Sequence, residues 1–294
     1  MAKILVTGGS GFLGSHLVDV LVERGHQVVV FDRVRSKWPA EQVVQLVGEL
    51  TDESALAAAV AGCDAVYHLA GFADLNAAKT RPLDTIHANI LGTVQLLEAM
   101  RTAGVTRFVF ASTAYVYSRE GGFYRCSKQA CESYIEEYAR TFGTRYTILR
   151  FGSLYGPRAD ASNGVYRLLR TAMAEGRIRY VGAPDDIREY IHVEDAAHLS
   201  VQVLAPEFEG QHVMLTGNSP TRAADLFTMF QEILGRRVEI EYRHVEGAGH
   251  YAVTPYAYTP RPGKKLVTTS YVDMGQGLLR MVEAIHHDIE HHEP

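Results

Sequence analysis

The first twenty residues contain the feature that most restricts the fold of this chain. Residues 4–6 are a short apolar run, glycines follow, and leucines then recur at helical spacing over 13–21, which predicts a strand, a tight turn and a helix. Gly8, Gly11 and Gly14 lack the Cβ atoms that would block a close turn, the approach of a diphosphate, or helix packing on the sheet. The new helix would also direct its unpaired N–H groups and positive dipole end at a phosphate.

The next predicted strand ends on an acidic residue. Residues 27–31 form a run typical of a buried parallel strand, and Asp32 follows it. A carboxylate at this distance from the glycines binds the ribose hydroxyls of adenosine and repels a 2′-phosphate, which predicts NAD rather than NADP. Arg33 and Arg35 leave an alternative open, because a guanidinium here can pair with a 2′-phosphate, stack on adenine or remain solvated.

Composition and charge exclude several classes of protein. A chain of 294 residues that is 47% hydrophobic can form one large domain, or a large and a small one. The net charge of −5, without a block of like charges, does not indicate binding to nucleic acid or to an anionic membrane. A strand beginning near Lys3 leaves no room for a signal peptide, and no apolar run reaches membrane-spanning length. We therefore expect a cytoplasmic protein, and the spacing of its three cysteines indicates neither disulfides nor zinc.

Strands and helices alternate over the first half of the chain. Further strands are predicted at 43–47, 65–70, 107–111 and 146–149, and helices at 51–61, 82–101 and 123–142. Alternation of this kind predicts an α/β, Rossmann-type, doubly wound parallel sheet with helices on both faces. We assign 1–150 to an NAD-binding Rossmann domain, with some later segments returning to it, and 151–294 mainly to a smaller substrate-binding part.

A tyrosine and a lysine one helical turn apart follow the fifth strand. Tyr124 and Lys128 share a helix face. Lowering the pKa of a phenol from about 10 to about 7 requires roughly 4 kcal/mol. One ammonium about 4 Å away, at an effective dielectric constant near 20, supplies about that much. Tyr124 is therefore a candidate acid and base, Lys128 would also hold the nicotinamide ribose, and Thr113 would hydrogen-bond to the reacting substrate oxygen.

Together these motifs resemble the extended short-chain dehydrogenase/reductase superfamily, in its NAD-dependent nucleotide-sugar epimerase/dehydratase branch. The resemblance covers nearly the whole chain, and the motifs occur in family order. They are residues 7–14, 48–50, 68–71, Asn89 with Gly92 and Thr93, 112–117, Tyr124 with Lys128, 154–157 and 188–195.

The resemblance implies specific ligand contacts. Arg188 would clamp the diphosphate of a sugar nucleotide, which suits the paired donors of a guanidinium, and Ser153 stands where an asparagine commonly contacts the nucleotide. Thr113 would complete the substrate contacts. The expected cofactor contacts, with Arg33 included from its place beside Asp32, are Gly8, Gly11, Phe12, Leu13, Asp32, Arg33, Glu49, Leu50, Leu69, Ala70, Gly71, Tyr124 and Lys128.

The resemblance also implies a homodimer. Its interface would be a four-helix bundle formed by the helices near 82–101 and 123–142 of each subunit.

Several positions depart from the family pattern. Family members that dehydrate sugar nucleotides place acids directly after the strand-five Ser/Thr, where this chain has Ala114 and Tyr115. The segment from Thr113 to Tyr124 is also much shorter than usual, so part of the substrate cover is missing. Glu49 replaces a usual aspartate near the adenine. The absence of acids at Ala114 and Tyr115 favours 4-epimerisation or oxidation at one carbon over 4,6-elimination. The short segment and Glu49 indicate an unusual substrate, or one that is bound more openly.

Two other functions remain open at this stage. One is an NAD(P)-dependent dehydrogenase or reductase of a non-nucleotide alcohol or ketone, and the other is a catalytically silent dinucleotide-binding sensor or scaffold. No metal site is predicted: the histidines at 286, 287, 291 and 292 are interpreted as an exposed helix end, where partly charged histidine favours the C-terminal end of the helix dipole.

Overall fold

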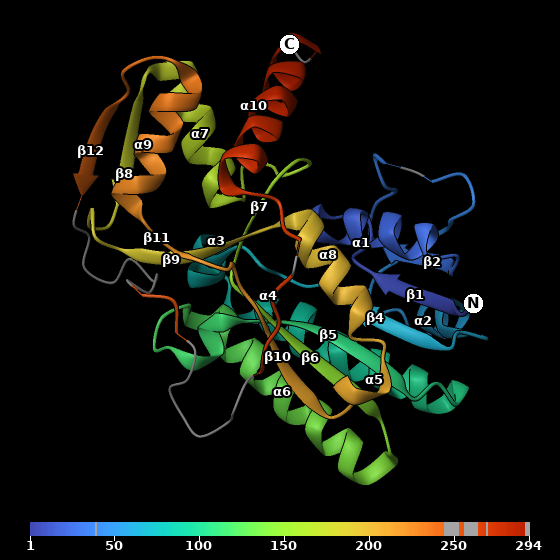
Figure 1. The fold of residues 1–294 in the computed structure, drawn as a ribbon. Helices are drawn as coiled ribbons and strands as arrows, with labels where there is room; N and C mark the ends of the chain where they lie inside the picture. Colours follow the sequence, from blue (N-terminus) through green and yellow to red (C-terminus); the bar gives the residue numbers. More distant parts are fainter. Residues whose placement is uncertain (39, 244–252, 256–263, 269, 292–294) are drawn as a thin grey trace.

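The central sheet contains eight parallel strands in the order β13-β10-β6-β5-β4-β1-β2-β3 (Figure 1). It belongs to a computed structural model that describes residues 1–38, 40–243, 253–255, 264–268 and 270–291. The strands are β1 (Lys3–Thr7), β2 (Gln27–Asp32), β3 (Val44–Val47), β4 (Ala65–His68), β5 (Arg107–Thr113), β6 (Arg145–Phe151), β10 (Gln211–Leu215) and β13 (Lys264–Lys265). The predicted α/β Rossmann-type fold is confirmed.

Strand order places the ligand crevice. From β1 the chain crosses to β2 on one side, and β4 then pairs with β1 on the other side. The order of the strands therefore reverses at β1. In open α/β sheets, ligands bind outside the carboxyl ends of the strands at such a reversal. Gly8 directly follows β1, so the glycine-rich turn lies at this point.

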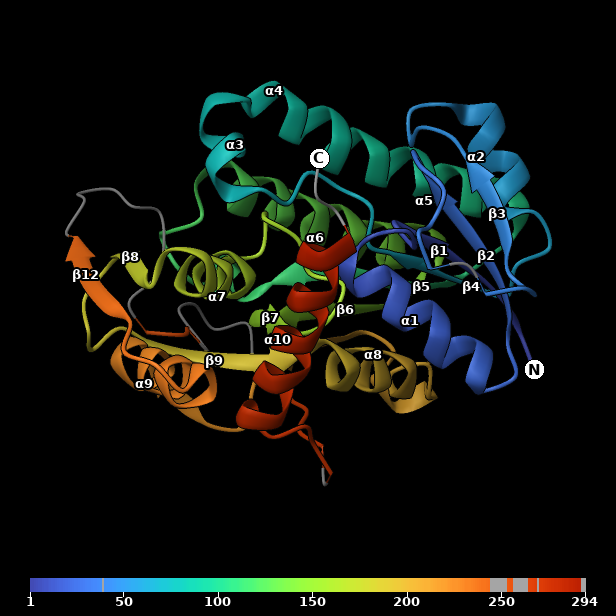
Figure 2. The ribbon, with the colours of Figure 1, turned by 90° about the horizontal axis from the view of Figure 1, so that it is seen from above.

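Helices cover both faces of the sheet (Figures 1 and 2). One face packs against α1 (Phe12–Glu23) and α8 (Val193–Gln202), and the other against α2 (Glu53–Val60), α5 (Gly92–Ala103) and α6 (Gly122–Phe142). In β1, Ile4 and Val6 face the first layer and Leu5 faces the second. Because both faces are buried, the strands are continuous apolar runs rather than alternating ones.

The helix predicted over 82–101 is confirmed, and it contains one distortion. It runs without a break through α4 (Pro82–Thr85), a π-helical turn η1 (Ile86–Leu91) and α5, and an unpredicted α3 (Leu75–Thr80) precedes it. The buried Asn89 in η1 accepts a hydrogen bond from Phe72 N (2.6 Å) and donates to Phe72 O (3.1 Å) and Ser127 Oγ (2.8 Å). These contacts hold a local widening of the helix, a distortion often found at functional sites.

The remaining elements form a smaller body beyond one end of the sheet (Figure 1). A three-stranded sheet contains β7 (Ser153–Tyr155), β9 (Ile187–His192) and β11 (Pro220–Arg222), and β8 (Arg177–Val181) pairs with β12 (Glu239–Arg243). The helices α7 (Gly164–Glu175), α9 (Ala223–Leu234) and α10 (Met274–His291) share a separate apolar core with them. Since β10, β13 and α8 lie with the large sheet, both halves of the chain contribute to it. No helix in the described residues is both long and apolar enough to cross a bilayer.

Candidate active site

The glycine-rich turn between β1 and α1 has no room for side chains at two positions. A Cβ atom on Gly8 would lie 2.5 Å from Ala70 N, and one on Gly14 would lie 2.1 Å from Gly8 O. Gly8 also has a φ of +75°, a conformation that favours glycine. The backbone can therefore turn tightly against the end of β4 and present the N-terminus of α1, as binding of a diphosphate requires.

Asp32 lies beside this turn at the end of β2. Its carboxylate accepts hydrogen bonds from Ser10 N (3.0 Å) and, at 3.5 Å, from Val34 N. These contacts hold the acidic group against the glycine turn, where a ribose would follow the diphosphate. The position agrees with the expected contact to ribose hydroxyls, which stays a prediction.

A cavity of about 590 Å³ opens between the glycine turn, the end of β2 and the π-helical turn. This volume is within the range of small-molecule and cofactor sites. Nine of the thirteen expected cofactor residues line it: Gly8, Gly11, Asp32, Arg33, Glu49, Leu50, Leu69, Ala70 and Gly71. Its volume, its glycines and the Asp32 carboxylate fit the adenosine diphosphate part of a dinucleotide.

The other lining residues were not predicted as contacts from the sequence. They include Phe72, Arg81, Asp84 and His87, which come from the segment that follows β4. The Arg81 guanidinium carbon lies 5.2 Å from the Phe72 ring centroid, and Arg81 pairs with Asp84. No spacing in 72–87 marks these residues, because they meet only after the chain folds back through α3.

The predicted catalytic residues meet at the carboxyl end of β5. Tyr124 lies in the first turn of α6, and its hydroxyl hydrogen-bonds to the side chain of Thr113, the last residue of β5. Lys128, one turn further along α6, is buried and donates from Nζ to Ala111 O (2.8 Å). Its Nζ lies 6.0 Å from the Tyr124 ring centroid. A substrate oxygen that reaches Thr113 would therefore also reach the Tyr124 hydroxyl.

The protein's own groups do not lower the pKa of Tyr124, contrary to the expectation that Lys128 would do so. Burial raises the pKa of Tyr124 to about 12, although the hydrogen bond with Thr113 opposes this change. Burial likewise lowers the pKa of Lys128, because the ammonium loses water. The Lys128 ammonium is also bound to a backbone carbonyl. A lysine on the same helix face therefore does not by itself bring the phenol pKa near 7.

A buried series of hydrogen bonds passes through His68, at the end of β4. The His68 ring bonds through Nδ1 to Thr7 Oγ1 (2.7 Å) and through Nε2 to Thr93 Oγ1 (2.9 Å), and Thr93 donates to Asn89 O (2.5 Å). Since the Thr93 hydroxyl proton is used by Asn89 O, we assign the His68 proton to Nε2. Burial lowers the pKa of His68 to about 3, which keeps the ring neutral. This series of hydrogen bonds links the ends of β1 and β4 to η1.

The other predicted contacts are not among the residues that line this cavity. Phe12 and Leu13 open α1, Ser153 lies in β7 and Arg188 lies in β9. Ser153 and Arg188 are both half-buried. Their roles toward a substrate stay predictions. No cluster of three potential metal ligands occurs within the described residues, and residue 292 of the histidine group lies outside them.

Comparison with known proteins places the chain among enzymes. The profile of the NAD dependent epimerase/dehydratase family matches residues 4–215. The UDP-glucose 4-epimerase of Erwinia amylovora is 32% identical over 246 residues, which cover 69% of this chain and 73% of that protein. The 2-alkyl-3-oxoalkanoate reductase of Stenotrophomonas maltophilia is 35% identical over 231 residues, which cover 69% of this chain and 66% of that protein. The crystal structure of a Thermotoga maritima UDP-glucose 4-epimerase with UDP-glucose has a TM-score of 0.83 at 25% identity and covers 98% of this chain and 99% of that one.

Proposed function

The chain belongs to the NAD dependent epimerase/dehydratase family, and from this premise we propose that it is a sugar-nucleotide 4-epimerase, or an oxidoreductase acting at one sugar carbon. The observation that carries the proposal is the hydrogen bond between Tyr124 and Thr113 at the carboxyl end of β5. Lys128, one turn along α6, connects this pair to the cofactor cavity, because a Cβ on the lining residue Gly71 would lie 3.8 Å from Lys128 Nζ. NAD, when bound, supplies the hydride acceptor and, in its oxidised form, a positive charge near the phenol.

The protein's own groups have separate tasks in this reaction. Tyr124 accepts the proton of the substrate hydroxyl through its side-chain oxygen, and Thr113 hydrogen-bonds to the oxygen as negative charge develops on it. Lys128 holds the ribose hydroxyls next to the nicotinamide. Ser153 and Arg188 bind the nucleotide end of the substrate from the smaller body. The glycine turn and Asp32 hold the cofactor diphosphate and the adenosine ribose.

The two residues after Thr113 support a reaction at one carbon. Ala114 is fully buried and apolar, and Tyr115 is half-buried, so neither position offers a carboxyl group for 4,6-elimination. Oxidation or epimerisation at one carbon needs only a proton acceptor, an oxyanion partner and the cofactor.

A binding and turnover screen tests the proposal. Purified protein is titrated with UDP-, dTDP-, GDP- and CDP-hexoses, and thermal shift and NAD-coupled or coupled-epimer assays are recorded. Mass spectrometry of released small molecules identifies any retained ligand. We expect a UDP-hexose both to stabilise the protein and to be converted. No response to any of these sugar nucleotides would reject the proposed substrate class.

Reduction of a non-nucleotide ketone is the second candidate. The similarity to the 2-alkyl-3-oxoalkanoate reductase and the short segment between Thr113 and Tyr124 favour it. The same screen separates the two functions, because a reductase of this kind would turn over a ketone with NADH or NADPH and ignore all sugar nucleotides. Any turnover at all excludes the silent sensor.

Replacing Asp32 by asparagine is expected to weaken the preference for NAD over NADP at least about tenfold. The change removes the charge that would repel a 2′-phosphate and retains a side-chain oxygen for Ser10 N. Calorimetric dissociation constants for both cofactors measure the preference. An unchanged ratio would show that Asp32 does not contact the adenosine ribose.

We also propose a homodimer built from α4, η1, α5 and α6. Among these segments, α4, η1 and α6 carry exposed large apolar side chains at Leu83, Ile86, Leu91, Phe123, Tyr134 and Phe142. Sedimentation of the wild type is expected to give twice the chain mass, and the Ile86→Glu/Leu91→Glu variant is expected to be a monomer, because buried charges would oppose association. Ile289→Glu, at an equally exposed position on α10, should leave the mass unchanged. A monomeric wild type would reject the dimer.

A further inference from the structure

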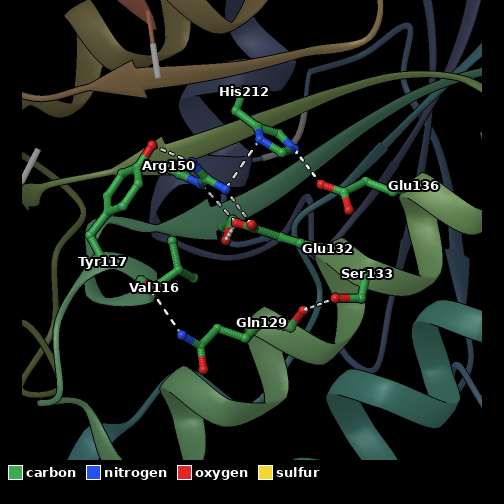
Figure 3. Close-up of polar contacts among 9 residues, drawn as sticks. Val116, Tyr117, Gln129, Glu132, Ser133, Glu136, Arg150 and His212 are labelled. Atoms are coloured by element: carbon green, nitrogen blue, oxygen red, sulfur yellow. Dashed lines mark hydrogen bonds and ion pairs between the residues drawn. The ribbon is translucent and has the colours of Figure 1, made fainter. Parts of the chain in front are cut away.

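The helix that carries Tyr124 and Lys128 has a third polar side chain on the same face. Glu132 lies one turn after Lys128 and has only 2% of its side chain exposed. Its carboxylate accepts hydrogen bonds from Ser112 Oγ (2.5 Å), Arg150 Nε (3.0 Å) and Arg150 Nη2 (2.6 Å). Figure 3 shows Glu132 directed from α6 at Arg150 on β6. The catalytic mechanism uses none of these three residues.

The Glu132–Arg150 pair joins α6 to two strands at one level of the sheet. Ser112 and Arg150 are register partners on β5 and β6, so the carboxylate bonds to neighbouring residues of both strands. Ser112 immediately precedes Thr113, the last residue of β5. Any shift of α6 along β5 must therefore break this contact as well as the one between Tyr124 and Thr113.

The same pair also holds the residues that follow Thr113. These form the 3₁₀ turn η2 (Ala114–Tyr117). Arg150 Nη1 donates to the Tyr117 hydroxyl, and the guanidinium carbon lies 4.5 Å from the Tyr117 ring centroid. Gln129, also on α6, donates from Nε2 to Val116 O (2.9 Å) (Figure 3). Side chains of α6 therefore contact both the residue before Thr113 and the turn after it.

Stability alone is a weak reason for such a pair. The side chains of Arg150 and Glu132 are 1% and 2% exposed, and the loss of their hydration offsets most of their attraction. Two parallel charge-assisted hydrogen bonds do, however, restrict geometry strongly. A misplacement of about 1 Å between reacting groups can lower a rate about 10²-fold. A rigid contact next to Thr113 therefore matters more for alignment than for folding energy.

We propose that Glu132 and Arg150 are positioning residues for the reaction, which set α6 against β5 so that the Tyr124 and Thr113 hydroxyls converge on one substrate oxygen. This inference rests on the proposed roles of Tyr124 and Thr113. Its prediction is a loss of kcat with little change in the binding of cofactor or substrate.

The test removes the pair without leaving one charge buried. In Glu132→Gln/Arg150→Met both charges are absent and the side-chain volumes are nearly kept, so the protein is expected to fold. We expect kcat to fall about 10²-fold, and KM and the NAD dissociation constant to stay within about threefold. The matched control is Glu137→Gln/Arg140→Met, which removes an exposed Glu–Arg pair of the same helix and should leave kcat unchanged.

A single substitution tests the positioning role if the double variant does not fold. Ser112→Ala removes one hydrogen bond and leaves the ion pair, and we expect kcat to fall about tenfold, with recovery in Ser112→Thr, which restores a hydroxyl. Wild-type kcat in either the folded double variant or Ser112→Ala would overturn the proposal. So would an equal loss in the Glu137→Gln/Arg140→Met control.

A spectroscopic measurement separates this inference from the proposed substrate. In protein labelled with ¹³C at the tyrosine ζ carbon, the Tyr124 signal is assigned by its loss in Tyr124→Phe. We expect this signal to shift in the double variant and in Ser112→Ala, because the hydrogen bond with Thr113 changes. An unmoved signal overturns the positioning role whatever the substrate is, whereas absent sugar-nucleotide turnover in the wild type rejects only the proposed function.

Discussion

Replacing Tyr124 by phenylalanine is expected to lower kcat about 10²- to 10⁴-fold, the usual contribution of a general acid or base, while NAD binding stays within about threefold. The ring that packs in the site remains, and only the hydroxyl that bonds to Thr113 is lost. Single-turnover and steady-state kinetics with the substrate found in the screen measure the loss, and calorimetry measures the affinity for NAD.

The pH profile provides a second measurement of the same group. Oxidation needs the phenolate, so its rate should rise with pH until the Tyr124 hydroxyl has titrated. Burial raises the pKa of this phenol and the positive charge of oxidised NAD lowers it, so the pH at which the rate stops rising measures the balance of the two effects. This rising part should be absent in Tyr124→Phe. Tyr134→Phe, at an exposed position of α6, should keep both the rate and the profile.

Wild-type turnover in Tyr124→Phe would reject the proton transfer assigned to this residue. A loss of NAD binding in that variant would instead indicate that the hydroxyl serves mainly to hold the cofactor.

Replacing Gly8 by alanine is expected to weaken NAD binding at least about 100-fold. The added Cβ would meet Ala70 N at 2.5 Å and Leu69 C at 2.8 Å, and both are backbone atoms that cannot rotate away. The turn must therefore move at the place where the cofactor diphosphate approaches the backbone. Isothermal titration with NAD measures the affinity, and circular dichroism verifies that the variant is folded.

Gly25 provides the control for this change. It has a φ of +79°, close to that of Gly8, but a Cβ there would meet no atom within 4 Å. Gly25→Ala should therefore show only the conformational cost of a left-handed residue, about 1–2 kcal/mol of stability, and bind NAD normally. NAD affinity in a folded Gly8→Ala that equals the wild-type value would show that the close approach at this turn is not needed for binding.

Sequence patterns were sufficient where structure depends on near neighbours. The strand, glycine turn and helix over 1–21 follow from apolar periodicity and from the absence of Cβ atoms. The helix expected over 51–61 begins where Asp52 can cap it, and the Asp52 side chain accepts a hydrogen bond from Ala55 N. Tyr124 and Lys128 share a face of α6 because helical geometry requires it.

The same patterns failed where contacts join distant parts of the chain. Asn89, which hydrogen-bonds to Phe72, lies in a π-helical stretch that the continuous apolar stripe of the sequence does not indicate. Arg81 enters the cofactor cavity only because α3 returns the chain to the end of β4. In the sequence, Glu132 adds only a charged residue to one face of a predicted helix. In the structure it is buried, because Arg150 and Ser112 lie opposite it and bind its carboxylate.

The amino-acid sequence by itself determined the alternation of strands and helices, the glycine turn, the acidic end of β2 and the spacing of Tyr124 and Lys128. Each of these features depends on residues that lie within about one helix or strand of one another. Tertiary structure alone decided the strand order that brings these segments to one edge and the widening at Asn89. It also decided the burial that raises the pKa of Tyr124 and the ion pair beside Thr113. Desolvation and long-range contacts depend on which surfaces meet, and local sequence does not specify that.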